Sequence, residues 1–251
     1  MRMGRGELTG PTPARLSPGL PDPLPRSAES HVRRPSRIAV FLFGGLLLLV
    51  GLGILGLYLA SQHVPAAYRR ALDADPNELV RASNETVRKA LALSGAAKHD
   101  KWHVRFTADE INGWLAVDMP KNHPDLLPAD FSEPRVAITP QKMTLFCRYR
   151  RGKTTSALSL AVDVYVAEPD VLALRIRRAR AGALPLPLGE VLDRISREAR
   201  RRQFRLQWKQ KQGDPVALVP LELRCDKDDR VLRVEAVELR QDEVYVSGTT
   251  E

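Results

Sequence analysis

The 251-residue sequence is poor in the residue types on which most reactive sites are built. Its two cysteines, Cys147 and Cys225, exclude a disulfide-dense scaffold and a zinc site built on a CxxC pair. It contains no GxSxG motif, no glycine-rich loop that would cradle a phosphate, and no cysteine next to a base. The adjacent acids Asp109 and Glu110 are explained by helix capping. We therefore expect a protein that is not an enzyme and that carries no cofactor.

Clustered metal ligands are also lacking. His99 and His103 are four residues apart, the spacing at which two ligands share one face of a helix. However, no glutamate follows His99 as it would in HExxH, and the run Lys98-His99-Asp100-Lys101 is typical of a solvated loop. We therefore predict no metal site.

Charge is absent from 23 consecutive residues, Ile38 to Ala60. As a helix this run would be about 35 Å long, enough to cross a hydrocarbon core of about 30 Å. It is too long for the apolar part of a secretory signal, and no A-x-A cleavage pattern follows it. The run predicts a single, retained transmembrane helix over residues 38–60.

Residues 1–37 have no apolar periodicity, and they hold seven of the 19 prolines and seven arginines against three acids. Such a segment cannot bury enough apolar surface to offset the entropy of ordering it, so we expect a disordered, basic, proline-rich tail. A proline-rich ligand for a partner protein is the alternative interpretation.

The arginines that flank the uncharged run predict its orientation. Four lie shortly before it and two shortly after it, so the positive-inside rule places the tail in the cytoplasm and residues 61–251 outside the cell membrane; they are Arg26, Arg33, Arg34 and Arg37, then Arg69 and Arg70. The tail carries +4 of the net charge of +9, which leaves +5 on the outer 191 residues. Nucleic acid is not expected as a partner there, whereas anionic lipid headgroups are natural neighbours. The sequence does not identify a protein partner.

Two helix-start signals follow the predicted span. Asp75, Pro76 and Glu78 begin a helix that Gly95 ends, so residues 61–103 are expected to form a juxtamembrane helical segment. Thr107 and Glu110 form a second capping box, at the start of an outer domain over residues 104–251. The prolines between residues 118 and 128 predict a loop.

From Arg135 onward the apolar residues alternate with a period of two, which predicts β-strands. Strands are expected over 143–149, 158–166 and 172–176, with a hairpin turn at 168–170. A helix beginning at Pro187 and ending near Arg202 interrupts them; strands over 204–208 and 219–225 and a last hairpin about 241–243 follow. This order predicts an α+β domain with a curved antiparallel sheet.

Two features of this domain allow more than one interpretation. Cys147 and Cys225 each extend the apolar face of a strand, so they are either two core cysteines or, outside the membrane, a disulfide. A basic run is either the solvated face of a helix or a contact with anionic lipid; it comprises Arg194, Arg197, Arg200, Arg201, Arg202, Arg205, Lys209 and Lys211.

Four segments together resemble a known family. They are FTADEINGWLA (106–116), GALPLPLGEVLDRI (182–195), the strand with Trp208, and VELRQDEVYVSG (237–248). Over residues 104–250 the chain resembles the bacterial membrane-anchored YpmS-like proteins, and its strand–helix–strand layout is similar to that of tubular lipid-binding (TULIP-like) proteins. This resemblance implies a strongly curved sheet wrapped on a central helix, with an elongated apolar groove able to hold acyl chains.

The resemblance also implies which residues would contact a lipid. The groove would be lined by the apolar strand faces, namely Leu158, Leu160, Val162, Val164, Leu172, Leu174 and Ile176. Arg200, Arg201 and Arg202 are expected near the headgroup. The same apolar residues would equally form an ordinary core, since every sheet needs a buried face. Two functions are therefore expected: an anchored lipid-binding protein, or a structural or interaction protein of the cell envelope with a packed core.

Overall fold

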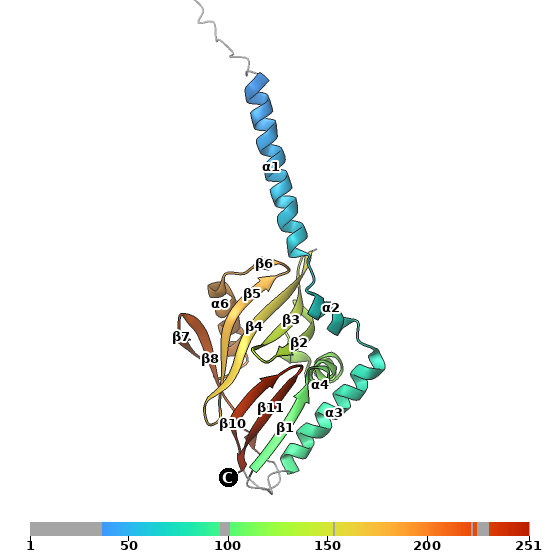
Figure 1. The fold of residues 1–251 in the computed structure, drawn as a ribbon, viewed down its shortest axis with the longest axis vertical. Coiled ribbons are helices and arrows are strands. Elements are labelled where there is room, and N and C mark those ends of the chain that lie inside the picture. The colour runs from blue at the N-terminus through green and yellow to red at the C-terminus, as the bar shows by residue number, and fades with distance from the viewer. Residues whose placement is uncertain (1–36, 96–100, 153, 222, 225–230, 251) are drawn as a thin grey trace, which may run out of the picture. The chain divides into compact units, whose positions relative to one another are not determined.

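The computed structural model describes residues 37–95, 101–152, 154–221, 223–224 and 231–250. Nearly all of the predicted tail lies outside these residues, as do His99 and Cys225. The contacts divide the chain into two units, Met1–Leu46 and Leu47–Glu251. The folded domain lies in the second unit (Figure 1).

Helix α1 (Arg37–Ser61) coincides with the uncharged run. Ten large apolar side chains between Leu46 and Leu59 are 50–69% exposed. Within the part of the chain that the structure describes, no single helix combines the length and the apolar composition needed to cross a membrane. Leu48–Ser61 and helix α2 (Ala66–Leu72), which meet at a bend of 45°, meet that requirement only as a pair.

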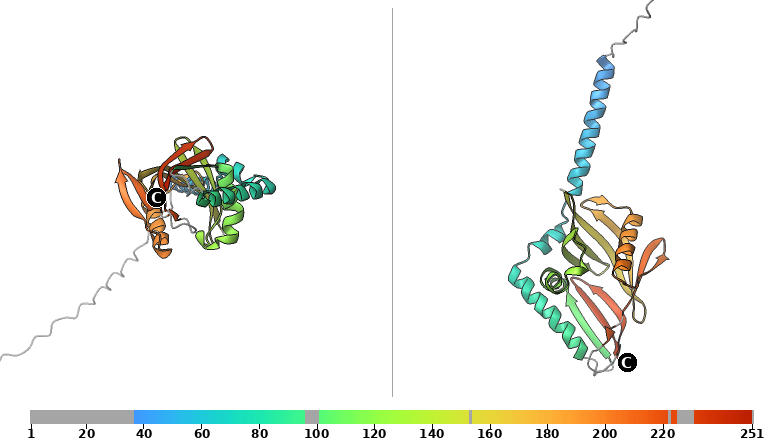
Figure 2. Two further views of the ribbon diagram at one scale, coloured as in Figure 1. Left: turned by 90° about the horizontal axis from the view of Figure 1, so that it is seen from below. Right: turned by 180° about the vertical axis from the view of Figure 1, so that it is seen from behind.

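The predicted helix starts are confirmed. Helix α3 (Pro76–Gly95) begins after Asp75, whose Oδ1 accepts a hydrogen bond from Asn77 N at 2.7 Å. Helix α4 (Ala108–Gly113) begins with the complete capping box of Thr107 and Glu110. Helix α4 contacts α3, β1 and β2, and Figures 1 and 2 show it where the strands of two sheets meet.

The loop predicted over residues 118–128 is wrong for most of its length. The chain continues from α4 through the π-helical turn η2 (Trp114–Asp118), helix α5 (Met119–Asn122) and the 3₁₀ turn η3 (Pro124–Leu126). Pro120 and Pro124 lie in the first turn of their helices, where a proline costs no hydrogen bond. Prolines therefore begin short helices here instead of preventing them.

The strands form two antiparallel sheets instead of the single predicted sheet. The four-stranded sheet has the order β1-β11-β10-β9, and the seven-stranded sheet has the order β2-β3-β4-β5-β8-β7, with β6 paired to β5. The strands are β1 (Lys101–Thr107), β2 (Phe131–Thr139), β3 (Lys142–Arg151), β4 (Thr154–Glu168), β5 (Val171–Ala181), β6 (Leu184–Pro185), β7 (Gln207–Lys211), β8 (Asp214–Pro220), β9 (Leu223–Arg224), β10 (Val231–Arg240) and β11 (Glu243–Thr250). The α+β class with an extensive antiparallel sheet is thus confirmed.

Strand β1 explains why one sheet was expected. It crosses the predicted boundary between residues 103 and 104, and it pairs with β11 at the far end of the sequence, Trp102 opposite Gly248. Its inward residues Trp102, Val104 and Phe106 alternate with polar ones, but the pairing that creates the second sheet is long-range. Local periodicity carries no information about such a partner.

The predicted hairpins and the second long helix are confirmed, with shifted ends for the later strands. Asp170 and Asp242 have positive φ in the β4–β5 and β10–β11 turns, and Gln212 and Gly213 do so in the β7–β8 turn. Helix α6 (Leu188–Arg201) ends where predicted. Strand β7 starts at residue 207 instead of 204, and β8 starts at 214 instead of 219.

The two sheets are joined at the β4–β5 turn. Asp170 Oδ1 accepts a hydrogen bond from Val234 N of β10 at 2.8 Å, and Asp170 N donates to Val234 O at 3.0 Å. Val234 is among the most deeply buried side chains and packs with Trp102 and Leu232. The turn of one sheet therefore docks on the backbone of the other.

Candidate ligand site

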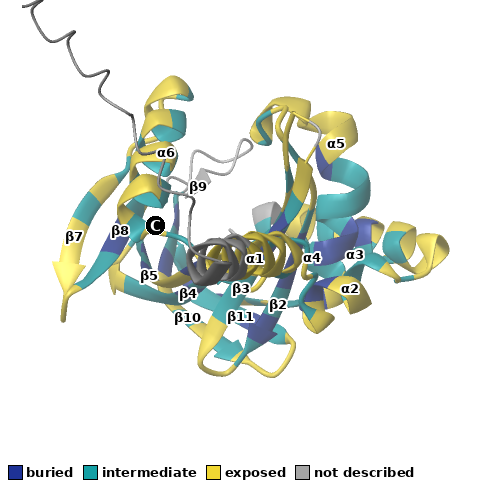
Figure 3. Ribbon diagram, turned by 90° about the horizontal axis from the view of Figure 1, so that it is seen from above, coloured by how far each residue is buried: buried dark blue, intermediate teal, exposed yellow. Residues whose placement is uncertain are grey.

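The seven residues predicted to line a groove do share one face of the seven-stranded sheet. Strand register places Val162 opposite Ile176, Val164 opposite Leu174, and Leu158 and Leu160 opposite small residues of β5. Met143, Leu145 and Cys147 of β3 belong to the same face. We call this the inner face, because the strands form an arc in Figure 3 with α6 on its inner side.

Where the inner face meets the four-stranded sheet, the surface is hollowed into an open cavity of about 330 Å³. Val164, Leu172 and Leu174, three of the predicted residues, line it. The other described lining residues are also apolar: Leu93, Trp102, Val104, Phe106, Met143, Leu221, Val234, Val237, Val244 and Val246. The indole N–H of Trp102 donates to Thr249 O at 3.0 Å, so the cavity is left with apolar groups only.

Next to this cavity the inner face is closely packed. Val162 and Ile176 are each only 2% exposed, so these two predicted residues belong to the core and do not line the cavity. Of the seven predicted residues, two therefore belong to the packed core, whereas Val164, Leu172 and Leu174 line the cavity. An alternation of apolar residues predicts which face they occupy, but it does not predict whether other side chains reach them.

At the other end the inner face is only partly covered. Leu158, Leu160 and Cys147 are half-buried there, and Leu145 is 39% exposed. In register, Leu145 lies opposite Leu160 and Cys147 lies opposite Leu158. These side chains continue the apolar row that enters the cavity at Met143.

Helix α6 crosses this partly covered region. Trp208 lies on the inner face, opposite Ala217, and its indole N–H donates to Ser196 Oγ at 2.7 Å. From the same helix, Arg194 donates to Tyr149 Oη on β3 at 3.0 Å. No residue of α6 is fully buried, although its apolar side is directed by these contacts toward the sheet. The helix thus covers the inner face without sealing it.

The side chain of Arg194 lies between two aromatic rings. Its guanidinium carbon is 4.8 Å from the ring centre of Phe131 and 4.7 Å from that of Tyr149. These rings come from paired residues of β2 and β3 and are 5.1 Å apart. Arg194 Nη2 is also 3.5 Å from an Asp130 carboxylate oxygen. The sequence pattern placed Arg194 in a basic run but gave no signal that it reaches across the sheet.

The arginines predicted to contact a headgroup lie at the C-terminal end of the same helix, where Arg202 is the C-cap residue. Arg202 forms an ion pair with Glu198 at 2.8 Å, and Arg201 approaches the same carboxylate at 3.9 Å. Arg200 is exposed. None of the three lines the apolar cavity. Arg194, by contrast, contacts the side chain of Tyr149 on the inner face.

Burial on the apolar face and the charge of Arg194 shift the pKa of the Cys147 thiol in opposite directions. Burial raises the pKa of Cys147 to about 11, and the positive charge of Arg194 opposes this by lowering the same pKa. A thiol with this pKa is almost wholly protonated at neutral pH. Cys147 is a free thiol in the structure, and Cys225 lies outside the described residues.

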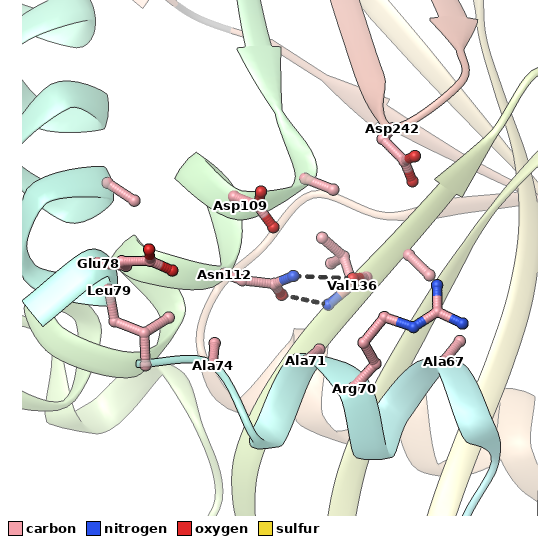
Figure 4. A pocket seen from close by; sticks show the side chains of 13 residues that line it. Ala67, Arg70, Ala71, Ala74, Glu78, Leu79, Asp109, Asn112, Val136 and Asp242 are labelled. Atoms are coloured by element: carbon pink, nitrogen blue, oxygen red, sulfur yellow. Dashed lines mark hydrogen bonds between the residues drawn. The ribbon is translucent and has the colours of Figure 1, made fainter. Parts of the chain in front are cut away.

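A second pocket, of about 430 Å³, surrounds Asn112 (Figure 4). Asn112 is buried, its Nδ2 donates to Val136 O at 3.0 Å, and its Oδ1 accepts from Val136 N at 2.7 Å. The amide thus replaces a neighbouring strand along the free edge of β2. Arg70, Glu78 and Asp109 line the same pocket but are exposed. We call these two hydrogen bonds, which hold α4 against the edge strand β2, the Asn112 clamp; their role is structural.

Metal ligands do not converge within the described ranges. No group of three or more His, Cys, Asp or Glu side chains there is placed to hold a metal ion. His103, half of the predicted histidine pair, is exposed on β1, a strand and not a helix. The helical spacing of the pair therefore does not apply to this residue.

The chain was also compared with known proteins. It matches no protein-family model, no curated protein and no solved structure. The resemblance to YpmS-like and TULIP-like proteins accordingly stays a prediction.

Proposed function

We propose that the protein is a single-pass, membrane-anchored envelope protein whose outer domain binds acyl chains along the inner face of the seven-stranded sheet. The observation that carries the proposal is the cavity of about 330 Å³ whose described lining is entirely apolar. Pockets of this size are typical of small-molecule sites, and their apolar lining is usually relieved by a few polar groups. Without such groups, a hydrocarbon chain is the best-matched occupant.

The anchor is supported by the composition and surroundings of α1. No single described helix has by itself the length and apolar composition to cross a membrane, so the anchor rests on the uncharged run of α1, Ile38 to Ala60, which as a helix would be about 35 Å long. Its described large apolar side chains are exposed around the helix, which is unfavourable in water and favourable in lipid. The positive-inside rule then places the N-terminal tail in the cytoplasm and the two sheets outside the membrane.

A connection between anchor and sheet supports access to lipid. Ala183, which follows β5, donates its N–H to Ala60 O near the end of α1 at 2.9 Å. At Gly182 an added Cβ would lie 2.4 Å from the same oxygen, so only glycine permits this approach. The inner-face strand β5 therefore begins its connection to α6 beside the residue where the predicted span ends.

Photo-cross-linking in membranes tests the proposal. The full chain would be expressed with a palmitate that carries a diazirine on its chain, irradiated, and digested for mass spectrometry. We expect cross-links on the strands that line the cavity, β4 and β5 of the inner face and β10 of the four-stranded sheet, in addition to those on α1. The Leu174→Trp variant, which fills the cavity, should lose most cross-links to these strands and keep those to α1.

Leu126→Trp is the matched control, because Leu126 is exposed on η3 and lies outside the cavity lining. It should cross-link as the wild-type chain does. Cross-links confined to α1 in the wild-type chain would overturn acyl-chain binding and favour the structural alternative, in which the domain has a filled core.

A further inference from the structure

The guanidinium of Arg194 is held in place by groups that do not neutralise it. The rings of Phe131 and Tyr149 lie within 4.8 Å and attract the cation through their π faces, and Tyr149 Oη accepts one of its hydrogen bonds. These contacts are electrically neutral, so the positive charge persists. Other N–H groups of the planar fork stay available, since a guanidinium has five.

The ion pair between Arg194 and its acidic partner, Asp130, is weak. Among the described residues, Asp130 is the one carboxylate within ion-pair distance, at 3.5 Å, and its side chain is 62% exposed. An exposed, long contact of this kind contributes little to stability. By contrast, Arg175 of β5 is buried against Asp214 at 2.6 Å. The aromatic and hydroxyl contacts thus fix the orientation of the Arg194 guanidinium, as in a binding site. Its ion pair with Asp130, by contrast, is as weak as one at the protein surface.

Arg194 also lies at the end of the apolar row on β3. Tyr149, Cys147, Leu145 and Met143 follow one another on the inner face, and Met143 lines the cavity. The row from Cys147 to Met143 is about 14 Å long at about 3.4 Å per residue. The Arg194 charge is close enough to lower the pKa of the Cys147 thiol. An amphiphile with its chain along this row brings its headgroup to Arg194.

We infer that Arg194 binds the anionic headgroup, a carboxylate or a phosphate, of an amphiphile whose acyl chain lies along Cys147, Leu145 and Met143. This inference rests on the proposed function, and it adds a ligand class and a specificity residue. Charge-assisted hydrogen bonds from a guanidinium fork to such oxygens are about twice as strong as neutral ones. We expect a preference of about tenfold for the anionic amphiphile over a neutral one with the same chain.

Protection of the Cys147 thiol from alkylation measures occupancy at this place. The experiment uses the full chain in a non-ionic detergent, with Cys225→Ser, and follows N-ethylmaleimide labelling by mass at about pH 9, where labelling is measurable. Oleate is compared with methyl oleate, and phosphatidylglycerol with a diacylglycerol of the same chains. The first pair tests a carboxylate and the second a phosphate. Each rate is divided by the lipid-free rate of the same variant, so a changed thiol pKa cancels.

We expect half-protection by oleate, phosphatidylglycerol, or both, at a concentration about tenfold below that of the neutral analogue. Arg194→Gln should abolish this difference and leave protection by the neutral analogue unchanged. Arg194→Lys should retain part of it, because the charge persists without the planar fork. Arg197→Gln removes an equal charge from an exposed position of α6 and should retain the whole preference.

The outcomes separate this inference from the proposed function. Equal protection by charged and neutral amphiphiles, or a preference that survives Arg194→Gln, overturns the role of Arg194 while leaving acyl-chain binding in place. No protection by any of the four lipids overturns the placement of the chain along the Cys147 row. Photo-cross-linking at the cavity strands then decides the proposed function independently.

Discussion

Two helices lie on opposite faces of the seven-stranded sheet, and they pack in contrasting ways. Helix α2 has only seven residues, yet its third residue, Tyr68, is 0% exposed and stacks on Phe146 of β3 with ring centres 5.3 Å apart. Helix α6 has 14 residues and buries none of them completely. Phe146 lies between Leu145 and Cys147 in β3, so α2 covers the face opposite to the one that α6 crosses.

This difference indicates that α2 makes a structural contact with the sheet, whereas α6 leaves apolar surface of the sheet partly uncovered. Tyr68 Oη donates to Glu133 O at 2.7 Å, so the ring is fixed by both burial and a hydrogen bond. Helix α6 is attached through polar contacts of Arg194 and Ser196 at its two sides. Its apolar side and the inner face beneath it therefore keep surface that another apolar molecule can cover.

Replacing Tyr68 should produce the largest loss of stability. Tyr68→Ala removes the stacked ring from the contact between α2 and β3, and we expect a cost of about 3–5 kcal/mol in the free energy of unfolding. Urea unfolding of the full chain in detergent, followed by tryptophan fluorescence, measures it. Tyr68→Phe keeps the ring and loses only the bond to Glu133, so it should cost about 1 kcal/mol. Equal costs for the two variants would contradict this account of α2.

Asn112→Ala should rank next. The change leaves the buried N–H and C=O of Val136 without partners, at about 2–4 kcal/mol for the two groups together. Asn122→Ala is the control, because the exposed Asn122 amide donates to Asp118 at the surface, and it should cost less than about 0.5 kcal/mol. A cost for Asn112→Ala no greater than that of the control would show that β2 does not depend on the clamp.

Alkaline pH should destabilise the fold through Cys147. The pKa of its thiol is 9.0 in an unfolded chain and about 11 in the folded protein, because burial disfavours the thiolate. The unfolded state therefore releases its proton first, and stability falls as the pH rises above 9, by about 1.4 kcal/mol at pH 10. Burial also raises the pKa of Tyr68, which adds a loss of the same sign at higher pH.

Cys147→Ala isolates this effect, because it removes only the thiol contribution. The loss of stability attributed to Cys147 should therefore be absent from this variant when urea unfolding curves are recorded between pH 8 and pH 11. A wild-type stability that stays level up to pH 10 would contradict a buried thiol at this position.

The smallest effect should come from the apolar side of α6. Leu192 is half-buried on this helix, and Leu192→Ala should cost about 1 kcal/mol or less, well below a typical core leucine. The same urea unfolding assay measures it. A loss as large as that of Tyr68→Ala would make α6 part of a filled core and remove the contrast between the two helices.

Much of the fold follows from local sequence signals. The capping box at Thr107, the helix from Leu188 and the positive-φ turns at Asp170 and Asp242 were all predictable, because each depends on residues within a few positions. The pairing of β1 with β11 was not, since it joins residues more than 130 positions apart. Only the folded chain reveals that pairing, and with it the second sheet.

The candidate site was predictable to a similar extent. Alternation identified the inner face, because period two determines which side chains share a face. It did not separate Val162 and Ile176, which are packed, from Val164 and Leu174, which line the cavity. That separation depends on where the four-stranded sheet meets the inner face. The role of Arg194 depends likewise on how α6 crosses it.

The central claim is that an acyl chain occupies the cavity between the two sheets, and Trp102 reports on it directly. Trp102 lines the cavity, and with Trp114→Phe and Trp208→Phe it is the only tryptophan left of three. Titrating this variant of the full chain with bromine-labelled stearate should quench most of the Trp102 emission in a saturable manner, and unlabelled oleate should restore it. Emission that stays unchanged at saturating brominated stearate would contradict the claim.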